Sequence, residues 1–187
     1  MEKVFKSIKS SAVTKEASKL VLSELKSCGA LALKLNALRT SDDCKEDKVL
    51  KNEHLEVLHL MNLINLIAPY LSEKITLKVL SEVHKLFSYM SSELARHALK
   101  TIEAIFEALR VKNIVLETED IVVSLTSFVS LGDKNPLDTV ILASKLLRVA
   151  MDLLYNGQSS LWIKNLPPVC RSVIGMYDSR KFVIVIF

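Results

Sequence analysis

The feature that most constrains this chain is a repeating pair of helix patterns, each pair about 40 residues long. The three units begin near residues 53, 92 and 136, so successive starts lie 39 (92 − 53) and 44 (136 − 92) residues apart. One such helix pair cannot bury its own apolar face, so neighbouring pairs must stack into a continuous core. The pattern therefore predicts an all-α array in which each pair packs on the next.

The period identifies the kind of array. A repeat of ~40–47 residues with two or three helices per unit is typical of HEAT and armadillo repeats. The predicted fold class is thus a HEAT/armadillo-like α-solenoid of about three helix pairs, preceded by an N-terminal helical segment. We expect three parts, which are an N-terminal helical segment and polar loop (1–48), the helical repeats (49–179) and an apolar C-terminal tail (180–187).

Composition supports a helical protein. Half of the 187 residues are hydrophobic, whereas only 4 are Gly and 4 are Pro. Few helix breakers and many aliphatic residues favour helices over a loop-rich fold. Aromatic residues make up 6% of the chain, which disfavours a β-sandwich or a platform for stacking bases.

Some local patterns are ambiguous or irregular. Residues 121–129 are rich in β-branched side chains and in isolation read as a strand, but the acidic residues after Thr118, the predicted N-cap, favour a helix. In the last pair, Pro167-Pro168 predicts a break between short helices at 159–165 and 169–177. The helix at 55–68 is apolar on most sides, which predicts that neighbours enclose it.

The end of the chain is unusual for a repeat array. Residues 182–187, Phe-Val-Ile-Val-Ile-Phe, combine high β-propensity with no charge, as aggregation-prone segments do. A solenoid normally closes with a repeat whose outer face is polar. We therefore expect this chain to be a fragment or a shortened form of a longer repeat protein.

Charge, cysteine spacing and hydropathy disfavour a basic nucleic-acid arm, a cysteine metal site and a membrane span. The net charge of +4 is spread as +3, 0, −2 and +3 over residues 1–48, 49–90, 91–132 and 133–187, so no dense basic arm for nucleic acid is present. Cys28, Cys44 and Cys170 lack metal-ligand spacing and read as free thiols, with Cys28 and Cys170 in the core. No apolar run reaches the ~18 residues of a membrane span, so no membrane partner is expected.

No catalytic, metal-binding or cofactor-binding pattern is found. The four glycines are isolated, so neither a phosphate-binding loop nor a dinucleotide fingerprint can be formed. His54 and His59 are five residues apart and no acidic residue completes a ligand set. The sequence therefore predicts a protein that is not an enzyme and uses no cofactor.

Candidate contact residues lie on the polar faces of the predicted helices. Solvated helix surface is the simpler interpretation of each, and packing within the last repeat is the simpler role for Trp162 and Tyr155. The candidates for contact with a partner are Glu56, His59, Asn62, Arg96, Lys100, Lys145 and Arg148.

Three stretches resemble a known family: Leu55-Glu56-Val57-Leu58-His59-Leu60-Met61-Asn62-Leu63, Pro69-Tyr70-Leu71-Ser72-Glu73-Lys74-Ile75 and Ser92-Glu93-Leu94-Ala95-Arg96-His97-Ala98-Leu99-Lys100. With the helix pairs between residues 55 and 179, they look like the HEAT/armadillo-type relatives of the ribosomal RNA processing factor of the twelve series (RRP-twelve-like), particularly the plant members. The resemblance implies a nuclear or nucleolar, non-enzymatic protein that assists ribosome biogenesis and binds proteins or pre-ribosomal particles. It supplies no defined set of functional residues.

Three alternatives remain open at this point. A karyopherin-like transport adaptor would grip a peptide cargo, although such arrays often use regular Trp ladders and this chain has one Trp. Direct RNA contact would make affinity fall steeply with salt, because phosphate contacts release counterions. A truncated, inactive form of a longer repeat protein would instead show poor solubility traceable to its tail.

Overall fold

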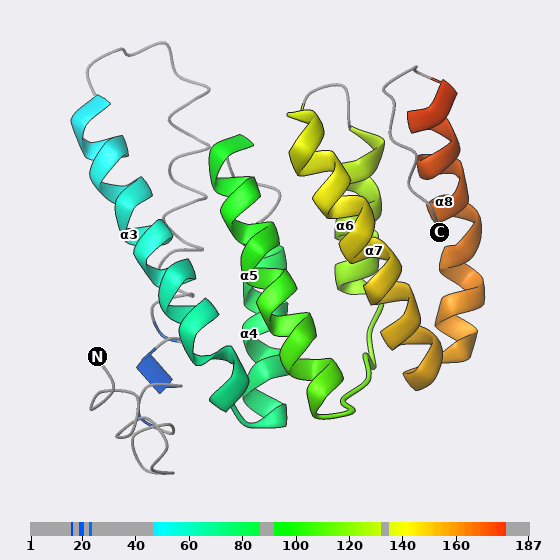
Figure 1. Cartoon of the computed structure of the whole chain (residues 1–187), viewed down its shortest axis with the longest axis horizontal. Helices are drawn as coiled ribbons and strands as arrows, with labels where there is room; N and C mark the ends of the chain where they lie inside the picture. Colours follow the sequence, from blue (N-terminus) through cyan, green and yellow to red (C-terminus); the bar gives the residue numbers. More distant parts are fainter. Residues whose placement is uncertain are drawn as a thin grey trace. The chain divides into compact units, whose positions relative to one another are not determined.

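The computed structural model describes residues 16, 19, 20, 23, 47–86, 92–131 and 135–178 (Figure 1). Over the last three ranges the chain forms α-helices and one 3-10 helix, with no strand. The elements are α3 (Asp47–Ile67), η1 (Ala68–Tyr70), α4 (Glu73–Leu86), α5 (Ser92–Val111), α6 (Asp120–Ser130), α7 (Leu137–Gly157) and α8 (Ser159–Asp178). The predicted all-α class is confirmed.

The repeat period is more regular than the sequence pattern indicated. The first helices of the pairs, α3, α5 and α7, begin 45 residues apart in both steps (92 − 47 and 137 − 92). The first interval was underestimated because α3 begins at Asp47, six residues before the predicted start at residue 53. Hydrogen bonds between equivalent helices span 40, 42, 45 and 46 residues. Contacts at one period apart are what a stacked helical-repeat solenoid requires.

The chain clusters into two compact units, and we describe each by itself. The first ends at Ala108 and contains α3, η1, α4 and most of α5, whereas the second begins at Leu109 and contains the last turn of α5 with α6, α7 and α8.

In the first unit, α3 lies against α5. The Thr101 hydroxyl of α5 donates a hydrogen bond of 3.5 Å to the Met61 carbonyl of α3, and both residues are buried. Fully buried side chains such as Ile64 and Ile102 each stabilise the fold by about 1.5–3 kcal/mol. However, α3 is not enclosed as predicted, because three leucines on one of its faces are 40–56% exposed: Leu55, Leu63 and Leu66.

In the second unit, α6, α7 and α8 all pack against one another. The ambiguous β-branched stretch is helical, and its buried residues Ile121, Val122, Leu125 and Val129 follow the helical period. Burial of that face against α7 and α8 outweighs the local β-propensity. The N-cap of α6 is Glu119 and not the predicted Thr118.

The predicted break at Pro167-Pro168 is wrong, because α8 runs through both prolines. Each proline removes an N–H donor, so the carbonyls of Ile163 and Lys164 lose their helical partners. Both of those residues are exposed, so solvent can hydrogen-bond to the two carbonyls. On the opposite face Ser172 is held by α6, since its hydroxyl lies 2.6 Å from that of Ser130.

The predicted burial of Cys170 is also wrong, because this free thiol is exposed. It lies on the face of α8 opposite the buried Val169 and Ser172. That exposed face is largely apolar and includes Ile163, Leu166, Pro167, Cys170 and Ile174. The predictions for Cys28, Cys44 and the segment 180–187 concern positions outside the described residues.

Candidate functional site

A groove of about 600 Å³ opens in the second unit, between the C-terminal end of α5, the segment that follows it and the C-terminal half of α7. Aliphatic side chains of Val115, Val149 and Leu153 contribute to its lining. The polar residues that line it are Arg110, Asn113, Asp152, Tyr155 and Asn156. A concave, partly apolar surface with a few convergent polar groups is the usual form of a binding site.

One wall of the groove is shaped by the way α5 ends. The N–H of Asn113 donates to the Arg110 carbonyl at 3.1 Å, and the N–H of Ile114 donates to the Leu109 carbonyl at 2.9 Å. These two bonds, with Asn113 at φ 53, form a Schellman motif. Leu109 and Ile114 are both buried, which supplies the hydrophobic contact of that motif. The motif therefore fixes the backbone positions of Arg110 and Asn113.

The segment after α5 then runs close beside α7. The N–H of Leu116 donates to the Leu153 carbonyl at 3.2 Å, which ties the segment to the middle of the groove. At the end of α7, a Cβ on Gly157 would clash with the Leu116 carbonyl oxygen and lie 3.0 Å from the Val115 side chain. Glycine at this position thus permits the close approach of two backbones.

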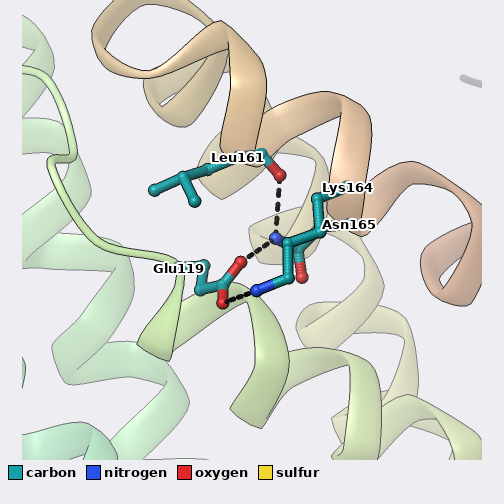
Figure 2. Close-up of polar contacts among 4 residues, drawn as sticks. All are labelled: Glu119, Leu161, Lys164 and Asn165. Carbon is teal, nitrogen blue, oxygen red and sulfur yellow. Dashed lines mark hydrogen bonds and ion pairs between the residues drawn. The ribbon is translucent and has the colours of Figure 1, made fainter.

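The far end of the same segment is anchored by Glu119 (Figure 2). Its carboxylate accepts a hydrogen bond from Lys164 Nζ at 2.6 Å and another from the Asn165 side-chain amide, both on α8. Asn165 is buried and also donates to the Leu161 carbonyl at 2.8 Å. The segment between α5 and α6 is therefore fixed at both ends, so this wall of the groove is preformed.

These contacts also set the acidity of Glu119. The pKa of this carboxyl lies below its ordinary value of 4.5. The hydrogen bond from Lys164 is the largest cause and the hydrogen bond from Asn165 is the next. Desolvation raises the pKa and so opposes these bonds, whereas the positive charge of Lys164 lowers it further. The charged form of Glu119 is therefore the one that the fold stabilises.

The polar residues of the groove are available to a ligand. Within the described part of the chain, no hydrogen bond or ion pair engages the side chains of Arg110, Asn113, Asp152 or Asn156. Tyr155 is 58% exposed and meets Trp162 edge-on, with ring centroids 5.5 Å apart. Trp162 is half-buried. The contact between these two rings joins the end of α7 to the start of α8 at the edge of the groove.

Two of the predicted contact residues lie next to the groove. Lys145 and Arg148 are exposed on α7, and Arg148 is one helical turn before the groove residue Asp152. The exposed face of α7 thus continues from these two cations into the groove.

The other predicted residues belong to the first unit. His59 and Asn62 are exposed on α3, and Arg96 and Lys100 are exposed one turn apart on α5. Glu56 belongs to α3, but its side chain is outside the described ones. None of the four described residues is among those that line the groove.

Arg110, Asn113 and Asn156 were missed as site residues. Their signal in the sequence is weak, because an Asn after a helical pattern reads only as a stop signal. Among the described residues, no cluster of His, Cys, Asp and Glu is suited to a metal ion, and no helix is long and apolar enough to cross a membrane.

The paired helices and their 45-residue spacing define the class as a HEAT-type helical-repeat protein. The family model described as RRP12-like, N-terminal HEAT repeats matches residues 1–113. The chain therefore belongs to the RRP12-like family of HEAT-repeat proteins, as the resemblance indicated. No curated protein and no solved structure matches it.

Proposed function

We propose that this chain is a non-catalytic helical-repeat scaffold that binds proteins or ribonucleoprotein particles during ribosomal RNA processing and ribosome biogenesis. The observation that carries the proposal is the match to the RRP12-like HEAT repeats over residues 1–113. HEAT arrays present extended surfaces on which partners are held. A nuclear or nucleolar location and pre-ribosomal particles as partners are part of the same proposal.

The second unit supplies a contact surface for this role. Its groove is concave and preformed. The side chains of Arg110, Asn113, Asp152 and Asn156 make no hydrogen bond or ion pair within the described chain. Lys145 and Arg148 extend it with positive charge along α7. A protein with acidic segments is a suitable partner for such a surface, since opposite charges speed encounter and fix orientation.

The test is to recover the tagged full chain from its own cells, with and without RNase, and to identify the bound proteins by mass spectrometry. We expect ribosome-assembly factors in both samples. Their loss after RNase would show that RNA bridges the contact and would replace the protein-scaffold proposal with an RNA-binding one. Recovery of chaperones alone would overturn the scaffold proposal.

A further inference from the structure

We propose that the groove beside α7 binds an extended peptide segment that carries an acidic side chain. This inference rests on the proposed scaffold function, because it specifies the kind of partner that the scaffold holds. The groove volume of about 600 Å³ falls within the range of about 300–1,000 Å³ found for sites that bury a drug-sized ligand, so the groove can hold a short part of such a segment.

The two asparagines of the groove are suited to a peptide backbone. A side-chain amide offers both a donor and an acceptor, which match the C=O and N–H of one peptide group. Asn113 is held at the end of α5 by the Schellman motif, and Asn156 is on the last turn of α7. Neither amide has a hydrogen-bond partner in the described chain, so both remain available to a ligand.

The charged residues of the groove indicate what the peptide carries. The Arg110 guanidinium can form two parallel hydrogen bonds with a carboxylate, and no such partner engages it in the described chain. Asp152 lines the same groove and suits a donor such as a basic side chain or a backbone N–H. A peptide with one acidic side chain can place that group on Arg110 and keep it away from Asp152. A nucleic-acid strand carries a phosphate at every nucleotide, so Asp152 disfavours it through repulsion.

The apolar part of the lining fits a peptide as well. Val149 and Leu153 lie four residues apart on α7, so they present a short aliphatic strip one turn long. Alternate side chains of an extended segment point to opposite sides, so one apolar residue can rest on this strip while its neighbours face solvent. Backbone recognition with one acidic anchor is thus the chemistry that the groove supplies.

The experiment selects ligands from a phage-displayed library of random linear peptides with the full-length chain. A synthetic copy of an enriched peptide is then titrated calorimetrically into the wild type and into the double variant Asn113→Gly/Asn156→Ala. Glycine preserves the left-handed conformation at position 113, so the variant removes both amides and keeps the turn. Asn62→Ala, an exposed asparagine on α3, is the matched control.

We expect enrichment of peptides with Asp or Glu, and affinity about tenfold weaker for the double variant than for the Asn62→Ala control. Selection with Arg110→Gln should abolish the preference for acidic residues. Failure to enrich any peptide would overturn the proposal, and so would equal binding by the double variant. Binding of an oligouridine strand in the same groove, sensitive to the same variant, would also overturn it.

Failure here is distinguishable from failure of the scaffold proposal. If the double variant still recovers ribosome-assembly factors from cells, the scaffold role stands and the groove is not its contact. If the wild type recovers none, the scaffold role fails regardless of what the peptide selection gives.

Discussion

At the end of α7, Gly157 is the residue against which the groove-forming segment rests. The Leu116 carbonyl occupies the space that a side chain at position 157 would need. Gly175 in α8 is the opposite case, because a Cβ there meets nothing within 4 Å. Of these two glycines, Gly157 alone is required by a close approach of another segment.

We expect Gly157→Ala to lower the free energy of unfolding by about 1–3 kcal/mol, because the backbone of the adjoining segment must move. Gly175→Ala should instead raise it by about 0.5–1 kcal/mol, since alanine loses less backbone freedom on folding a helix. Urea unfolding of both variants checks the pair. Equal effects of the two substitutions would contradict the role assigned to the Leu116 contact.

Among the elements, α6 and α8 run in the same direction and are tied near both ends of α6. At the start of α6, the Glu119 carboxylate accepts hydrogen bonds from Lys164 and Asn165. At the end of α6, the Ser130 hydroxyl is hydrogen-bonded to the Ser172 hydroxyl. The order of these contacts is the same along both helices, as it is for equivalent helices of successive repeats. The pair therefore defines the stacking of the second unit.

The Glu119 contact makes that stacking dependent on pH. Because the pKa of Glu119 is lowered in the folded chain, its contribution is present above about pH 4.5 and is lost as the pH falls through the folded value. We expect Glu119→Gln to be less stable than the wild type at neutral pH and to converge with it under acid conditions. Urea midpoints measured across this range test the expectation. Glu117→Gln, which removes an exposed acidic side chain from the same segment, is the control substitution. An offset between Glu119→Gln and the wild type that stays constant with pH would argue against the linkage.

The helix pairs and their period were predictable from the sequence because amphipathic patterns report burial directly. The continuity of α8 through Pro167 and Pro168 was not predictable. The two prolines signal a helix break locally, whereas the residues of α6 that hold α8 in place are distant in sequence. Of the candidate site, the sequence indicated only Lys145 and Arg148 on α7, which lie next to the groove and are not among its lining residues. The groove depends on a helix end and on the close approach at Gly157, which involve residues some 40 positions apart.

On the scale of the whole molecule, the partner surface should depend on where charge is placed and not on net charge alone. We expect Lys145→Glu/Arg148→Glu to reduce recovery of bound partners from cells at least several-fold, because it reverses the charge beside the groove. Lys74→Glu/Lys78→Glu changes the net charge equally on the exposed face of α4 and should leave recovery unchanged. Quantitative mass spectrometry of both variants makes the comparison. Equal losses would indicate a nonspecific electrostatic effect.

The chain contains a single tryptophan, Trp162, and it lies edge-on to Tyr155 at the rim of the groove. Its fluorescence therefore comes from one known place. A ligand that moves Tyr155 or excludes water from that rim will change the emission wavelength or the transfer of excitation from tyrosine to tryptophan. The protein thus carries an intrinsic optical reporter of groove occupancy, and no label needs to be attached.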